Sequence, residues 1–339
     1  MFKRGFFMVL TAIVSLACAK ENPSEQETQQ TASLVVNVSD VAATRATTVQ
    51  DSQIKATAGS IQVLVFNSSG LLVAFGENQA SSTSISLNIP TGAVTCYAYV
   101  NGNSRLKDVA TESELLQKTA YLKYSSPDGL KMIGKATHTV TGGSNSITIP
   151  VKRFAAKVQI DKITPAFTSP AHKAMEFKLK GIYLINVNGT CPYTQVPTAP
   201  SSYSEWYNRQ RYNKDYCDDM ISDILETPVI MQNSQGQVTA YTTPHYLYCY
   251  PNPVTTDSSA SNWSERFTRL VVETTLGETT YYYPVNIPSP ESNTMYQITN
   301  MKITGLGSNS PDKLVEKGSL AVSISITDWS TGFSKEVEY

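Results

Sequence analysis

The chain has 339 residues, and its 27 Lys and Arg nearly balance 28 Asp and Glu, so its formal net charge is −1. This balance excludes the strongly basic surface of a nucleic-acid-binding protein or of a protein that binds anionic lipid. Charged residues make up only 16%, while Thr, Ser, Val and Tyr are abundant, which is typical of an exported β-rich protein of about two domains.

The first 18 residues have the pattern of a bacterial lipoprotein signal. Lys3 and Arg4 precede the apolar run Phe6–Ala17, and Cys18 ends it. The run is too short to cross a bilayer, which needs ~20 residues. We expect a lipoprotein signal peptide over 1–18, cut at Cys18, whose thiol receives the lipid (palmitate) and which becomes the new N-terminus. The alternative is an ordinary secretory signal with a chance cysteine.

A short β-type segment follows a polar tether at residues 19–33. Leu34, Val35, Val36 and Val38 form this segment, and small polar residues come after it. Arg45 is the only basic residue between Lys20 and Lys55, so it offers an arginine-specific protease an accessible site before Ala46. The alternatives are a first strand that is never removed and a solvated loop arginine.

Alternating apolar residues and turn signals then predict strands along most of the chain. The expected strands are 61–66, 71–75, 84–90, 94–100, 145–151, 155–160, 175–180, 182–187, 245–250, 269–275, 279–285, 296–304, 320–327 and 333–339. Two short helices are expected, one after the capping box at 111–114 and one within 215–225. Prolines at 165 and 170 suggest a boundary between two tandem β-sandwich domains, 46–165 and 166–339.

The cysteines and histidines limit the possible covalent and metal chemistry. Without Cys18, the chain keeps Cys96, Cys191, Cys217 and Cys249, which permits two disulfides with three possible pairings. The three histidines have no metal-ligand spacing, so no metal site is expected.

The order of four features resembles the type V fimbrillin family of Bacteroidetes, the FimA/Mfa1-like major fimbrial subunits. These features are the signal ending at Cys18, the leader strand with Arg45, the run Val151–Val158, and a set of C-terminal motifs. The C-terminal motifs are Tyr246–Asn252, Asn293–Ile298, Gly305–Gly307 with Pro311, and Val322–Trp329. The resemblance implies transthyretin-like, Greek-key sandwiches.

The resemblance also implies an assembly mechanism for an outer-membrane lipoprotein precursor with a 19–45 propeptide. An arginine-specific protease cuts between Arg45 and Ala46, the leader strand leaves, and a C-terminal strand of another copy fills its groove. This implies adhesion-supporting fimbriae at the cell surface, with other copies and accessory subunits as partners. The candidate donor residues, in two C-terminal strands, are Val322, Ile324, Ile326, Phe333 and Val337.

Two further functions stay open from the sequence, and a catalytic function is not expected. The chain lacks HExxH, GxSxG and P-loop motifs, so neither enzyme activity nor a cofactor is expected. An aromatic and basic cluster could stack on a sugar or form a packed loop. It comprises Tyr203, Trp206, Tyr207, Arg209, Arg211 and Tyr212. The alternatives are therefore a monomeric glycan-binding surface lipoprotein and a fimbrial tip or anchor subunit.

Overall fold

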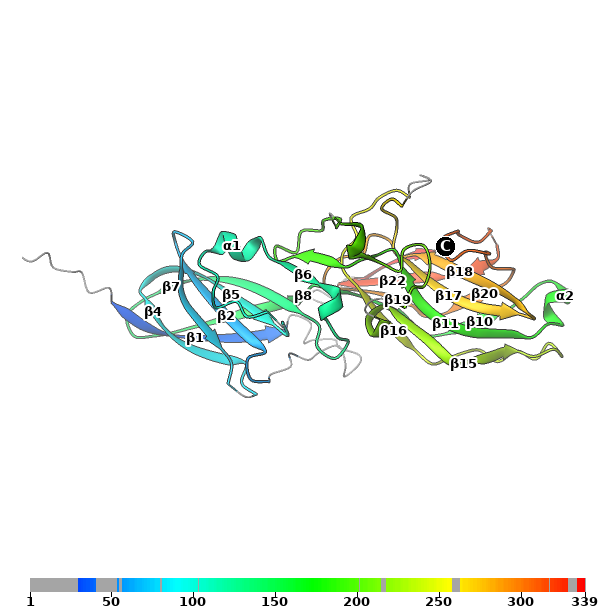
Figure 1. Ribbon diagram of the computed structural model, residues 1–339. Coiled ribbons are helices and arrows are strands. Elements are labelled where there is room, and N and C mark those ends of the chain that lie inside the picture. The colour runs from blue at the N-terminus through cyan, green and yellow to red at the C-terminus, as the bar shows by residue number, and fades with distance from the viewer. Residues whose placement is uncertain are drawn as a thin grey trace, which may run out of the picture.

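The computed structural model describes residues 30–40, 54, 57–79, 81–102, 104–200, 202–214, 218–257, 263–316, 318–328 and 334–338. Figure 1 shows two β-rich domains placed end to end, with the blue and cyan strands in one and the yellow to red strands in the other. The expected mostly-β fold with a few short helices is confirmed.

The first domain is built on a seven-stranded sheet with the order β3-β2-β5-β7-β8-β1-β4. Its strands are β1 (Thr31–Asp40), β2 (Ile61–Asn67), β3 (Leu72–Glu77), β4 (Ser84–Pro90), β5 (Gly92–Val100), β7 (Met132–Val140) and β8 (Ser144–Arg153). β7 and β8 are paired only through Met132–Arg153 and Ile133–Lys152. The sheet therefore divides there into a four-stranded and a three-stranded layer, which face each other as a sandwich.

The outer edges of the two layers come together at Gly76 in β3. A Cβ atom at this position would lie 2.7 Å from Leu87 Cδ2 and 2.8 Å from Ile85 Cγ2 in β4. Glycine is needed here because any side chain would force β3 and β4 apart.

The second domain contains three sheets, with the strand orders β16-β9-β19-β22-β23, β15-β11-β17-β18 and β10-β20-β21. Their bounds are β9 (Ala156–Ile160), β10 (Ile163–Pro165), β11 (Phe177–Ile185), β15 (Ser222–Gln232), β16 (His245–Cys249), β17 (Arg269–Leu276), β18 (Thr279–Asn286), β19 (Thr294–Ile298), β20 (Met301–Ile303), β21 (Leu320–Ala321), β22 (Ser323–Asp328) and β23 (Ser334–Glu338). Two short pairs, β6 (Thr119–Tyr121) with β13 (Thr190–Pro192) and β12 (Val187–Asn188) with β14 (Trp206–Tyr207), complete the described strands.

The change of domain comes earlier than the boundary expected at 165. β9 pairs with β16 in antiparallel and with β19 in parallel orientation, and β10 pairs with β20, so both strands belong to the second domain's sheets. Pro165 instead ends β10, where it is opposite Ile303 of β20, and Pro170 begins α2, so both prolines lie inside that domain. Strand pairing depends on partners more than 80 residues away in the chain, which local turn signals do not report.

Aromatic rings join the two domains. Tyr99 of β5 stacks on Tyr193 at a centroid distance of 5.0 Å, and Phe154 contacts Tyr193 at 5.6 Å and Tyr250 at 6.4 Å. All four rings are buried in one hydrophobic cluster that continues from the first domain into the second. We infer that this contact resists bending between the domains.

The helices are short and lie between strands. The expected capping box is confirmed, because Thr111 Oγ1 accepts from Glu114 N at 3.1 Å at the start of α1 (Glu112–Leu116). α2 spans Pro170–Lys173, and α3 spans Asp218–Ile221, shorter than the expected 215–225 because the chain enters β15 and pairs with β11. Single 3₁₀ turns lie at Leu122–Tyr124 and Tyr203–Glu205. Within the described ranges, no helix has the length and apolar character needed to cross a bilayer.

Candidate functional site

The expected leader strand is β1, and it lies between two neighbours within the first domain. β1 pairs in antiparallel orientation with β4, from Thr31–Pro90 to Asn37–Ser84. On its other side it pairs in parallel orientation with β8, from Ser33–Ser144 to Asp40–Val151. Because β1 has ladder partners on both sides, its removal would leave an open groove between β4 and β8.

One face of β1 fills the interior of the sandwich. Leu34 and Val36 are fully buried, and Val38 is 5% exposed, whereas Val35 lies on the half-buried outer face. Burying each of the three aliphatic side chains contributes about 1.5–3 kcal/mol. This strict alternation makes the strand a one-sided insert whose apolar pockets another strand with the same alternation could fill.

The outer face of β1 is held by polar contacts to both neighbours. Asn37 Oδ1 accepts from Ser84 Oγ of β4 at 2.6 Å, and Asn37 Nδ2 donates to Ser146 Oγ of β8 at 3.2 Å. Asn145 Nδ2 donates to the carbonyl oxygen of Ser33 at 3.4 Å. These contacts help to fix the register of β1 in the groove.

The end of β1 carries a buried ion pair. Asp40 accepts two hydrogen bonds from the Arg153 guanidinium, with Nη2–Oδ2 at 2.5 Å and Nη1–Oδ1 at 3.1 Å. The Arg153 side chain is 1% exposed and that of Asp40 7%. A bidentate pair at this burial is stable only while both partners are present, because either charge alone would be buried without compensation.

Arg153 also reaches the second domain. Asn293 Oδ1, just before β19, accepts from the Arg153 backbone N at 3.3 Å and lies 3.5 Å from Nη1. The guanidinium therefore links the leader strand, the end of β8 and the second domain. Sequence reasoning noted the run around Arg153 as a family motif but missed its role. The signal was a charged residue beside the apolar Phe154–Ala156, where a buried charge requires a partner.

The candidate donor strands lie in the second domain of the same chain. β22 pairs with β19 on one side and with β23 on the other. Val322, just before β22, is 6% exposed, and Ile324 and Ile326 within it are 0% and 7% exposed. Val337 pairs with Ile324 from β23, the edge strand of the sheet.

Several expected functional residues fall outside the described part of the chain. These are Cys18, Arg45, Ala46, Cys217 and Phe333. The Arg45–Ala46 bond falls within residues 41–53, the stretch that follows the end of β1 at Asp40.

The cysteines correct one expectation. Cys96, Cys191 and Cys249 are free and buried. Burial raises the pKa of the Cys96 thiol to about 11 and the pKa values of the Cys191 and Cys249 thiols to about 12. Two disulfides would need all four cysteines, so that arrangement is not formed. These thiols act as small apolar core residues.

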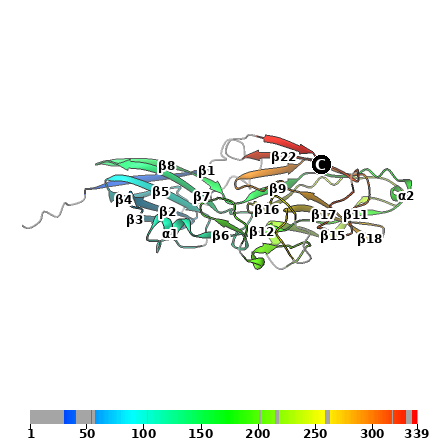
Figure 2. The same ribbon diagram turned by 90° about the horizontal axis from the view of Figure 1, so that it is seen from above.

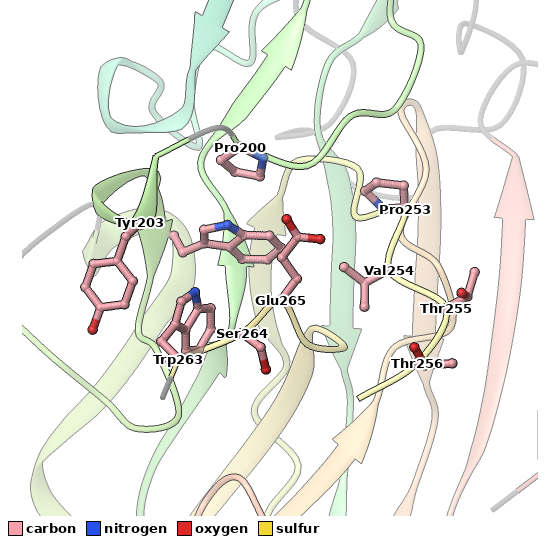
Figure 3. A pocket seen from close by; sticks show the side chains of 10 residues that line it. Pro200, Tyr203, Pro253, Val254, Thr255, Thr256, Trp263, Ser264 and Glu265 are labelled. Carbon is pink, nitrogen blue, oxygen red and sulfur yellow. The ribbon is translucent and has the colours of Figure 1, made fainter. Parts of the chain in front are cut away.

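Two members of the aromatic and basic cluster, Tyr203 and Trp206, line an open pocket of about 670 Å³ in the second domain. Figure 3 shows Tyr203 and Trp263 on one side of the pocket and Thr255 and Thr256 on the other, with Glu265 between them. Trp206 and Trp263 contact each other at a centroid distance of 5.8 Å.

Most of the expected cluster is used in packing within the second domain. Trp206 and Tyr207 are 3% exposed, and Tyr212 packs on Tyr183. The guanidinium carbon of Arg209 lies 3.4 Å above the Tyr203 ring, and its Nη1 donates to the Tyr203 carbonyl oxygen. Trp263, which the sequence did not point to, completes the aromatic wall. In the part of the chain that the structure describes, no group of three or more His, Cys, Asp or Glu side chains could hold a metal.

Comparison with known proteins gives one family. Residues 31–164 match the model of the major fimbrial subunit protein (FimA) family. This match begins at β1 and includes Asp40, both groove walls and Arg153. Among proteins of curated function no match is found.

Solved structures share the fold along nearly the whole chain. The fimbrillin FimA of Porphyromonas gingivalis superposes with a TM-score of 0.59 at 16% identity, over 89% of this chain and 98% of that one. A candidate cell adhesion protein of Bacteroides eggerthii gives 0.62 at 16% identity, over 88% and 96%. The tip fimbrial protein Mfa3 of P. gingivalis gives 0.50 at 15% identity, over 88% and 100%.

Proposed function

From the match of residues 31–164 to the FimA family of major fimbrial subunits, we propose that the chain is a fimbrial subunit of this kind, in which cleavage after Arg45 releases β1 and lets copies polymerise by strand exchange. As a fimbrial subunit it serves adhesion at the cell surface. Its role in this proposal is structural rather than catalytic, and its contacts are with other copies and accessory subunits.

The observation that carries the proposal is the placement of β1. The strand lies between β4 and β8, presents one apolar face to the core, and ends shortly before Arg45. Removing it exposes apolar pockets and two rows of backbone donors and acceptors. A strand from another copy restores hydrogen bonds contributing ~0.5–1.5 kcal/mol each and buries aliphatic side chains again. The contact joins unlike surfaces, so growth is linear as long as successive copies do not close into a ring.

The early steps of the proposal rest on the N-terminal sequence. The apolar run before Cys18 would direct export, and lipid on Cys18 would hold the precursor in the outer membrane. An arginine-specific protease would then cut between Arg45 and Ala46, separating the anchored leader from the assembling subunit.

Treating the purified precursor with an arginine-specific protease is expected to yield a ladder of detergent-resistant bands on an unheated denaturing gel. N-terminal sequencing should find Ala46 at the new terminus. The Arg45→Ala variant should stay monomeric, because its β1 remains attached. Arg211→Ala, which removes an exposed arginine from a described loop of the second domain, is the matched control and should polymerise normally.

The other outcomes of this experiment are distinct. Cleavage at Arg45 without a ladder would assign the chain to a terminal position, as a tip or anchor subunit. Resistance at Arg45 in a protein that stays monomeric would contradict the proposal and favour a glycan-binding surface lipoprotein.

A second candidate function, glycan binding, rests on the aromatic wall of the pocket in Figure 3. Flat aromatic rings beside hydroxyl and carboxylate groups suit the apolar face and the hydroxyl edge of a sugar. If this function holds, oligosaccharides should change the fluorescence of Trp206 and Trp263, and Trp263→Ala should weaken binding about tenfold or more. Tyr124→Ala removes an exposed ring of the first domain and should leave binding unchanged. Equal titration curves for all three proteins would exclude this site.

A further inference from the structure

Two segments at opposite ends of the described chain carry the same seven-residue pattern. Leu34, Val36, Val38 and Asp40 occupy alternate positions in β1. Val322, Ile324, Ile326 and Asp328 occupy alternate positions at the end of the second domain. In both, the three aliphatic side chains are buried, the residues between them are half-buried, and the carboxylate comes two positions after the last aliphatic residue.

The carboxylate at the end of β1 has a specific task in its groove. Asp40 neutralises Arg153, whose side chain is 1% exposed and which belongs to β8 and also contacts Asn293 of the second domain. When β1 leaves, the guanidinium stays behind on β8 without the Asp40 carboxylate. A replacement strand that supplied only apolar residues would fill the pockets and leave this charge without its carboxylate.

We propose that Asp328 of the incoming copy takes the place of Asp40 on Arg153, and that this ion pair fixes the direction and register of the exchanged strand. Val322, Ile324 and Ile326 then enter the pockets of Leu34, Val36 and Val38. This inference rests on the proposed strand exchange. It adds which strand is donated and which contact sets the direction and register of that strand.

The neighbouring strand β23 lacks the pattern. The sequence Ser334–Glu338 contains one aliphatic residue, Val337, between two glutamates, and no run of three alternating aliphatic residues. β23 instead covers the free edge of β22. In Figure 2, β1 and β8 lie along the upper side of the first domain, and β22 lies along the upper side of the second domain. β22 must therefore separate from both β23 and β19 before it can be donated.

The ion pair discriminates between the two directions of entry. β1 runs parallel to β8, which places Asp40 beside Val151, two residues from Arg153. A strand entering in the opposite direction would bring its carboxylate near Ser144, the far end of β8, more than ~20 Å from Arg153 at ~3.3 Å per residue. A shift by two residues would move it by ~6.6 Å, beyond the reach of a direct hydrogen bond.

The first test neutralises the donor carboxylate in the full chain. After protease treatment, subunits carrying Asp328→Asn should form the ladder about tenfold or more slowly than wild type, because the incoming strand then brings no carboxylate to Arg153 of the acceptor. Glu336→Gln, which removes one negative charge from β23, is the matched control and should polymerise at the wild-type rate. A wild-type rate for Asp328→Asn would overturn the inference.

The second test measures register directly by disulfide trapping. In β1, Asn37 is opposite Ser84 and Val35 is opposite Ser86. The proposed register therefore places Ser325 of the donor opposite Ser84, so the Ser84→Cys/Ser325→Cys chain should link neighbouring subunits upon oxidation. The Ser86→Cys/Ser325→Cys chain, displaced by two residues, should not.

The outcomes separate this inference from the proposed function. Cross-linking of the Ser86→Cys/Ser325→Cys chain would overturn the assignment of Asp328 while leaving strand exchange intact. A normal ladder in which neither cysteine pair cross-links would have the same meaning. If cleaved wild-type protein forms no ladder, the proposed function itself fails.

Discussion

Replacing Val36 by aspartate is expected to drive β1 out of its groove before any cleavage. Val36 is fully buried between the two layers of the first domain and lies among aliphatic residues. Keeping a carboxylate charged in such a site costs about 4–7 kcal/mol at neutral pH, in addition to the ~2 kcal/mol lost with the valine contacts. That sum approaches the whole stability of a typical domain.

Urea unfolding of the precursor, combined with mass spectrometry after limited proteolysis, measures this effect. The Val36→Asp precursor should unfold at a much lower denaturant concentration and be cut within residues 31–40. Val35→Asp places the same charge on the half-buried outer face of the same strand and is the matched control. It should lower the unfolding free energy by about 1 kcal/mol or less. An equal decrease in unfolding free energy in Val36→Asp and Val35→Asp would contradict the one-sided placement of β1.

Replacing Asp40 by alanine is expected to lower the unfolding free energy of the precursor by about 3–5 kcal/mol. The loss arises mainly from the uncompensated Arg153 guanidinium, since the side chain is 1% exposed and cannot reach bulk water. The double variant Asp40→Ala/Arg153→Met should recover much of the loss, because an aliphatic side chain in the same space needs no partner.

A surface ion pair of the same domain supplies the control for Asp40. Arg105 and Glu77 interact at 3.1 Å, but their side chains are 60% and 25% exposed. Glu77→Ala should therefore cost less than about 1 kcal/mol in the same unfolding experiment. A loss for Asp40→Ala no larger than that for Glu77→Ala would show that the buried pair does not stabilise β1 in its groove.

These two predictions concern two different parts of the groove that holds β1, the apolar pockets and the buried ion pair. The apolar row centred on Val36 holds any strand of suitable pattern, whereas Arg153 accepts only one that brings a carboxylate to a fixed place. Stability and selectivity of the groove thus come from different residues. A leader strand can be strongly held in the precursor and still be replaced by a second strand that satisfies both conditions.

Much of the site could be predicted from local sequence. The apolar run at Leu34–Val38 predicted a strand, and the alternation at Val322–Ile326 predicted a one-sided strand, because side chains in a strand point to opposite faces in turn. The capping box at Thr111 predicted the start of α1, since its hydrogen bonds join residues three positions apart. Such features depend only on neighbours along the chain.

The tertiary structure decided which strands meet. Asp40 and Arg153 are 113 residues apart, and Ser33–Asp40 pairs with β8 in parallel orientation, which no local pattern specifies. Strand pairing also places β9 in the second domain. In the folded chain Cys96, Cys191 and Cys249 are free thiols. The sequence by itself determined which faces of each strand are apolar. Only the folded chain determined which strands lie beside β1 and which buried charge its end must neutralise, because those partners come together through contacts between residues distant in the sequence.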